Sequence, residues 1–198
     1  MQGSRTFPKR AATKEQTPIG EGESYLRLAH HFLSSPSPSN PYTHLPTTHL
    51  THDPHATDSY QNLLFSLLHF RTLTHTYPSH ITIISHAFKR RRFLELHLPG
   101  IRWPRDRVTY VGIDPPECVT SKSSLEEGEE RRGYGVWKGD LYGVGEVLGG
   151  KRVGRGWREE CLGGLGEGVE EGVRGLLGWR GGESGVEVYG GDLPWAVE

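Results

Sequence analysis

The chain has 198 residues, a formal net charge of −1 and a hydrophobic content of 34%. This length suffices for one domain with its own core, and the balanced charge argues against nucleic acid or a membrane as a general partner. No apolar run approaches the ~20 residues of a membrane span, and no apolar segment follows the first cations as a secretory signal requires. We therefore expect a single cytoplasmic domain over residues 1–198.

Composition divides the chain into two halves. All 11 histidines lie in the first half, and most of the 27 glycines lie in the last third. A bias in codon composition explains this division without selection on function, so the individual glycines of residues 162–179 need no special role. Cys118 and Cys161 lack the spacing of a disulfide framework, which favours free thiols in a reducing compartment.

The first predicted element is a helix over residues 21–34. Tyr25, Leu28 and Phe32 recur there at helical spacing. The next segment, residues 34–57, is rich in Pro, Ser and Thr and predicts a long loop.

The strongest helix signal begins after Asp58. Asp58 and Gln61, three residues later, have the pattern of a capping box. Apolar residues then form a broad face over residues 59–77, and Pro78 ends this predicted helix.

Two short β-branched runs predict strands. Residues 80–85 read "HITIIS", which is typical of a strand buried on both faces, and residues 107–113 form the second run. A helix is expected between them over residues 88–97. The order helix, strand, helix, strand favours right-handed crossovers and a mainly parallel sheet with helices on its faces. The predicted fold class is therefore α/β with three layers.

The remainder of the chain carries weaker signals. Residues 125–133, "LEEGEERRG", predict a solvated loop, and a helix is expected around Glu167 to Trp179. We place the core of the domain at about residues 21–115 and treat the Gly-rich residues 116–198 as its C-terminal part.

Four cations, Lys89 to Arg92, directly follow the first predicted strand. Helical spacing directs Lys89 and Arg92 to one side and leaves Arg90 and Arg91 facing water. Such a run is a solvated helix face, a nuclear-import signal or an anion-holding turn. Ligands of parallel sheets lie beyond the carboxyl ends of the strands, where helix N-termini also attract anions. Duplex binding would need further basic and aromatic residues on the same face.

Several strings together resemble the fungal branch of the YdcF-like family (domain of unknown function 218). The resemblance implies a Rossmann-like α/β domain whose activity is not established and whose ligand is a nucleotide-like or other anionic small molecule, S-adenosylmethionine included. The strings that carry it are "EGESYLRLA", "DSYQNLLFSLLHFR", "ITIISHAFKRRRFLELH", "YVGIDPP", "DLYGVGEVLGGKR" and "LPW".

The resemblance also implies a set of ligand-binding residues. The first is a glutamate at the start of the first helix. An acidic residue before the second helix and a hydroxyl and an amide residue within it follow. The last are a hydroxyl residue and two cations after the first strand. In this chain those positions are Glu21, Asp53, Ser59, Asn62, Ser85, Lys89 and Arg92.

This chain departs from the family pattern at several places. Lys89 stands where relatives carry a histidine, which removes a base that titrates near neutral pH. Asp53 replaces a longer glutamate, and Ala56 stands where relatives commonly carry serine. The family begins with a strand and a Gly-rich turn, of which only Gly3 remains in "MQGSRT". We therefore expect one or more N-terminal strands to be missing, with unpaired backbone beside their place in the sheet.

Three other residue patterns are expected to have no functional role. His44, His49, His52 and His55 offer imidazole ligands for zinc but lack short ligand pairs with a defined turn, so no metal site is expected. The glycines of residues 143–150 form a near miss for a dinucleotide fingerprint without a preceding strand. The five tryptophans are expected to be packing residues.

The sequence predicts a domain that holds an anionic small molecule beyond its strand ends. No redox centre is present in the predicted residue set, so any reaction would be hydrolysis or transfer at a phosphate-like group. The alternative is a catalytically inactive or truncated relative that serves as an interaction module or has no stable function.

Overall fold

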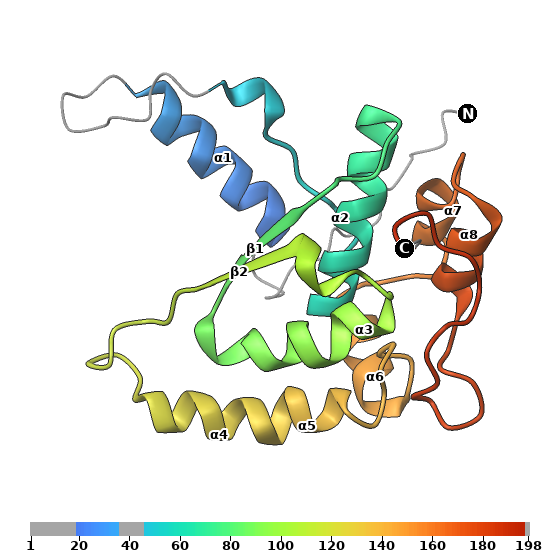
Figure 1. The fold of residues 1–198 in the computed structure, drawn as a ribbon. Helices are drawn as coiled ribbons and strands as arrows, with labels where there is room; N and C mark the ends of the chain where they lie inside the picture. The colour runs from blue at the N-terminus through green and yellow to red at the C-terminus, as the bar shows by residue number, and fades with distance from the viewer. Residues whose placement is uncertain (1–18, 36–45, 197–198) are drawn as a thin grey trace, which may run out of the picture.

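The structure, a computed structural model, describes residues 19–35 and 46–196. Within these ranges it contains helices and a two-stranded sheet (Figure 1). Strand β1 (Ile81–Ser85) pairs in parallel with β2 (Val108–Gly112), from Ile81 opposite Val108 to Ser85 opposite Gly112. The chain is therefore mixed helix and strand, as predicted for an α/β protein. The described residues do not show the predicted third layer or further strands.

The helices observed are α1 (Glu21–Ser34), α2 (Ser59–Thr74), α3 (Leu98–Gly100), α4 (Lys122–Arg132), α5 (Tyr134–Trp137), α6 (Glu146–Gly154), α7 (Cys161–Leu165) and α8 (Glu171–Gly178). Three 3₁₀ turns lie at Thr47–His49, Ala87–Lys89 and Arg105–Arg107, and a π-helical segment, η3, covers Arg92–His97. The predictions of a helix over 21–34, of the second strand and of a C-terminal helix near 167–179 are confirmed. The helix predicted over 59–77 forms but ends at Thr74, because His75 adopts the left-handed conformation of a C-cap.

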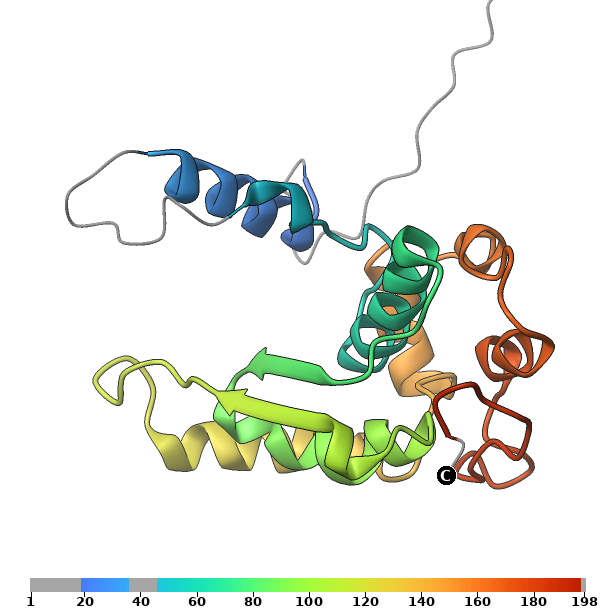
Figure 2. The ribbon, with the colours of Figure 1, turned by 45° about the horizontal axis from the view of Figure 1, so that its top comes forward.

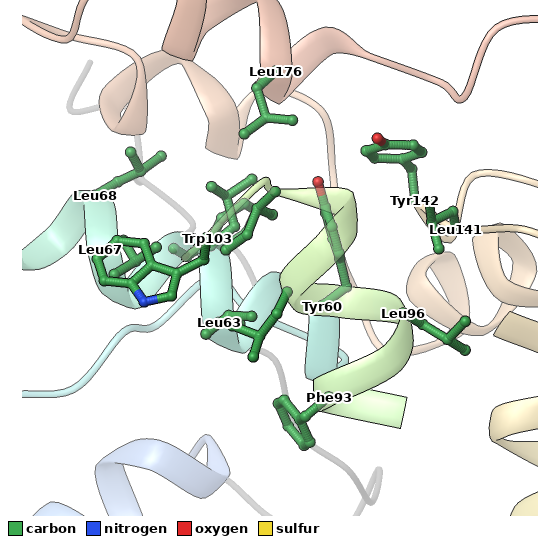
Figure 3. Close-up of a cluster of buried hydrophobic side chains, with 14 of the residues drawn as sticks. Tyr60, Leu63, Leu67, Leu68, Phe93, Leu96, Trp103, Leu141, Tyr142 and Leu176 are labelled. Atoms are coloured by element: carbon green, nitrogen blue, oxygen red, sulfur yellow. The ribbon is translucent and has the colours of Figure 1, made fainter. Parts of the chain in front are cut away.

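The core forms around one face of α2. Tyr60, Leu64 and Leu68 are buried, as the 3.6-residue period requires. They pack with residues of η3 and with Trp103 and Tyr142 (Figure 3). The cluster continues to Leu176, Leu193 and Trp195, so buried side chains from both halves of the chain join one core. The predicted packing role is confirmed most clearly for Trp103, Trp137 and Trp195, which are all buried.

The capping box before α2 forms only in part. Asp58 Oδ1 accepts a hydrogen bond from Gln61 N at 2.9 Å, which is the expected N-cap. Gln61 Oε1, however, accepts from Thr57 N at 2.9 Å and from Thr57 Oγ1 at 2.6 Å. The cap uses only Oδ1 of Asp58, so Oδ2 is available to another residue.

The prediction that β1 is buried on both faces is wrong. Its side chains alternate in exposure, and Ile84 is 69% exposed. In Figure 2 helices α3 and α4 lie on one side of the strands, while α1 lies on the other side and away from them. Helix α1 has no buried residue, and Tyr25 and Leu28 on it are 63% and 62% exposed. The upper face of the sheet is therefore open among the described residues.

Two further predictions are corrected. Residues 125–133 are mostly helical, because Ser121 caps α4 and Glu129 on it is buried against Arg92. Some glycines of residues 162–179 do have a steric role: a Cβ at Gly172 would collide with the carbonyl oxygen of Asp192. Close packing, in addition to any codon bias, therefore requires glycine at position 172.

Candidate functional site

A cavity of about 1060 Å³, lined by many charged and polar residues, opens at the carboxyl end of β1. Its walls come from the first turn of α1, the segment before α2 with the first turn of α2, the residues that follow β1, Ile113 after β2, and α6. This is the place where ligands of open parallel sheets bind. The first turns of α1 and α2 both line the cavity, so the N-termini of two helices contribute to its wall.

All the predicted ligand-binding residues lie on the wall of this one cavity. They come from three segments that are far apart in the sequence, and they are Glu21, Asp53, Ser59, Asn62, Ser85, Lys89 and Arg92. Their proximity is a property of the structure, whereas their role in ligand binding stays a prediction.

Lys89 is a partly buried amine that makes no hydrogen bond or ion pair within the described residues. Burial lowers the pKa of Lys89 below its usual value, and the neighbouring charge of Arg92 lowers that pKa further. Glu21 and Glu129 act in the opposite direction. Because the ammonium group can donate three hydrogen bonds, Lys89 has free capacity toward a group in the cavity.

Arg92 is engaged within the protein. Its Nε donates to Glu129 Oε1 at 2.7 Å, and its Nη2 donates to Glu129 Oε2. Nη1 donates to Ser59 Oγ at 3.1 Å. The carboxylate of Glu129 balances the charge of Arg92, so Arg92 fixes the wall of the cavity rather than supplying a free cation.

Ser59 has a second partner that sequence reasoning missed. Its Oγ lies 2.8 Å from Nε2 of His97, which is fully buried. Burial lowers the pKa of His97 well below its usual value, and the charges of Arg92 and Arg152 lower it further, so the imidazole is neutral. A π-helix bonds residues five apart, which brings Arg92 and His97 to the same side. No local sequence pattern indicates this alignment.

Helix α6 adds cations from the Gly-rich half. Arg152 donates to Asp58 Oδ2 at 2.5 Å and to the carbonyl of Tyr142 at 2.8 Å, so its guanidinium is engaged within the protein. Lys151 and Arg155 line the cavity from the same helix end, and Arg132 joins them from α4. The i, i+4 spacing of Lys151 and Arg155 indicates that the two cations share one side of a helix. No local sequence pattern indicates that this side lies at the strand ends.

The remaining predicted residues shape the walls. Asp53 accepts hydrogen bonds from the backbone of His55 at 2.8 Å and of Ala56 at 3.1 Å, so its carboxylate stabilises the turn before α2. Asn62 is exposed on α2, and Ser85 is half-buried at the end of β1. The polar groups of Asn62 and Ser85 are thus presented at the cavity wall.

The competing constellations do not assemble. His44 lies outside the described residues, and the residues that are described contain no group of three side chains placed to hold a metal ion. Asp140 accepts hydrogen bonds from the backbone of Val144 and Gly145 at 2.9 Å each, so the glycine pair at 143 and 145 forms a side-chain-capped turn before α6. No strand precedes that turn, and the dinucleotide interpretation lacks its structural context.

Comparison with known proteins gives one informative match. The chain is 29% identical over 106 residues to the uncharacterized protein YOR238W of Saccharomyces cerevisiae, a stretch that covers 50% of this chain and 35% of the yeast protein. The matched part is thus about a third of that relative's length. No family model matches the chain, and no solved structure matches it. Within the described ranges, no helix has both the length and the apolar character needed to cross a membrane.

Proposed function

We propose that the cavity at the end of β1 binds a small phosphorylated molecule. One observation carries the proposal: Lys89, Arg132, Lys151 and Arg155 line the cavity, and none of them pairs with a carboxylate among the described residues. The other lining cations are neutralised, Arg92 by Glu129 and Arg152 by Asp58. These four cations outnumber the lining carboxylates of Glu21, Glu23 and Asp53, so the cavity wall carries an excess of positive charge.

The start of α2 supports an anionic ligand. Helix α2 begins at Ser59 on the cavity wall, and the amides of a first helical turn attract anions such as phosphate, although Asp58 Oδ1 already accepts from the amide of Gln61. S-adenosylmethionine, which carries a sulfonium cation, fits this charge less well than a nucleotide. A nucleotide or a sugar phosphate is the class of ligand that we favour.

The domain is, in this proposal, a YdcF-like protein of the Rossmann-like class in the cytoplasm. The parallel pairing of β1 and β2 and the cavity beyond the carboxyl end of β1 support that assignment. The similarity to an uncharacterised yeast protein is compatible with a fungal branch and brings no activity with it.

Ligand binding is tested by thermal unfolding and calorimetric titration with inorganic phosphate, ATP and S-adenosylmethionine. A phosphorylated ligand at about 100 times its dissociation constant should raise the free energy of unfolding by ~2.7 kcal/mol. Lys89→Gln and Lys151→Gln should each weaken binding about tenfold. Lys138→Gln, at an exposed position away from the cavity, is the matched control and should bind as the wild type does. Equal affinity in all variants would place the ligand elsewhere.

The second candidate, an interaction module without catalysis, has one observation in its favour. Tyr25, Leu28 and Phe32 are large apolar residues of α1 with more than half of their surface exposed, and exposed apolar patches often mark interaction surfaces. If no phosphorylated ligand stabilises the protein while the Lys89 variants fold normally, this second function is the better account.

A further inference from the structure

Ser59, His97 and Arg92 form a cluster whose chemistry goes beyond holding an anion. Ser59 opens α2 on the cavity wall, whereas His97 lies in the core behind it. The π-helical turn brings Arg92 and His97 to the same hydroxyl, with Arg92 Nη1 at 3.1 Å and His97 Nε2 at 2.8 Å from Ser59 Oγ. Such π-helical segments are frequent at functional sites.

The two hydrogen bonds of Ser59 Oγ leave one lone pair of this oxygen without a donor among the described residues. Arg92 must donate, because a guanidinium group has no acceptor, so Ser59 Oγ accepts there. In the tautomer with the proton on Nδ1, the hydroxyl hydrogen points at Nε2 of His97. The orientation of the imidazole is fixed by packing, since its ring stands edge-on to Trp137 with centroids 4.6 Å apart. A hydroxyl within hydrogen-bond reach of a neutral imidazole is the arrangement of an activated serine nucleophile.

We infer that Ser59 is a nucleophile for phosphoryl transfer and that His97 is its base, an inference that rests on the proposed function of the cavity. The substrate class is a phosphate monoester, whose charge would be met by Lys89, Lys151 and Arg155. A purely structural role would explain the hydrogen bond between Ser59 and His97 equally well. It would not explain why Ser59 lies on the wall of a cavity lined by cations.

The reaction takes place in two balanced steps. Ser59 Oγ attacks phosphorus and forms an Oγ–P bond while the ester P–O bond breaks, and its electron pair leaves on the alcohol oxygen. His97 Nε2 takes the proton from Oγ and keeps it, while the alcohol oxygen, which leaves on the opposite side of phosphorus, takes a proton from a water molecule. The hydroxide left by that water then attacks the phosphoserine, the Oγ–P bond breaks with its electron pair on Oγ, and His97 returns its proton to Oγ. The sum is ester plus water giving alcohol plus inorganic phosphate.

Occupancy of the cavity would itself prepare the base. Burial and the charges of Arg92 and Arg152 hold the pKa of His97 low. A phosphate dianion beside Ser59 would offset those charges and stabilise the imidazolium, as an opposite charge within a few ångström does. Proton transfer from Ser59 is therefore favoured only when substrate is bound. No carboxylate orients His97 Nδ1, which has no partner in the described structure, and this distinguishes the pair from a catalytic triad.

The test uses p-nitrophenyl phosphate with the full chain, acid quenching and mass spectrometry of the peptides. We expect release of p-nitrophenol and phosphate trapped on Ser59. Ser59→Ala should abolish both, and His97→Gln should slow turnover by about 10²-fold or more, the usual contribution of a positioned base. Ser66→Ala, an exposed serine on the same helix, should react as the wild type does. Circular dichroism and phosphate titration establish that each variant is folded and how it binds.

The failures of the two proposals can be distinguished. Phosphate binding without p-nitrophenol release would overturn the role of Ser59 and leave the binding function intact. Turnover that persists in Ser59→Ala, or that proceeds without phosphoserine in the wild type, would also overturn that role. Absence of phosphate binding to the wild-type protein would overturn both proposals.

Discussion

His97 is a titratable residue in the core, and its protonation affects the stability of the protein. The unfolded chain binds a proton on this side chain near its ordinary pKa of 6.5, whereas burial and the charges of Arg92 and Arg152 keep the native pKa well below that value. The unfolded state therefore binds more protons at mildly acidic pH, and the free energy of unfolding falls as the pH drops below about 6.5.

We expect this loss from His97 to approach, at most, about 1.4 kcal/mol per pH unit until the native pKa is reached. His97→Gln should reduce the slope, whatever its effect at neutral pH. Urea unfolding at pH 7, 6 and 5 provides the comparison. Parallel pH dependences for the two proteins would show that His97 is not buried in its neutral form.

At the scale of elements, the junction between α2 and α6 depends on Asp58. One carboxylate oxygen caps α2 through Gln61 N, and the other accepts from Arg152, with both side chains largely buried. Asp58→Asn should preserve the cap but leave a buried guanidinium without a counter-charge, at a cost of about 3–5 kcal/mol. Asp58→Ala should cost about 1 kcal/mol more because the cap is also lost.

Chemical denaturation of the two Asp58 variants measures these differences. Glu126→Gln is the control, because the exposed pair of Glu126 with Lys122 should contribute less than about 1 kcal/mol. A loss below about 1 kcal/mol in Asp58→Asn would mean that the Arg152 pair is not buried in solution.

Elements with a local signal were predictable from the sequence. Helix α2 has the apolar period and the N-cap, and both strands are short β-branched runs. Helix α4 has no such period, and Gly128 lies within it, so the sequence indicated a loop. Its stabilising contact is between Glu129 and Arg92, 37 residues apart, and such a contact is invisible to local patterns. The open face of β1 was missed because a β-branched run does not reveal what covers it.

The candidate site was predictable to a similar degree. Lys89 and Ser59 were predicted as ligand-binding residues from the general location of ligands at strand ends and from the family resemblance. These two sources did not predict His97, whose alignment depends on a π-helical turn, or Arg132 and Arg155, which reach the cavity through the distant packing of α4 and α6.

At the scale of the molecule, packing is unevenly distributed. Helix α2 is buried in the core, whereas α1 contributes no buried residue and lies apart from the sheet (Figure 2). Few buried contacts mean local opening with a small free energy. We therefore expect the amides of α1 to exchange with solvent at least 10²-fold faster than those of the buried part of α2. Hydrogen exchange with mass spectrometry measures this, and equal protection of the two helices would contradict the arrangement.

The central claim is that the cavity beyond β1 holds a phosphate group between Lys89 and the start of α2. A crystal structure of the protein grown with inorganic phosphate tests it most directly. We predict a tetrahedral anion within hydrogen-bond distance of Lys89 Nζ and Ser59 Oγ, and its loss in Lys89→Gln crystals grown under the same conditions. An empty cavity at saturating phosphate, or an anion bound only to exposed cations such as Lys138, would contradict the account.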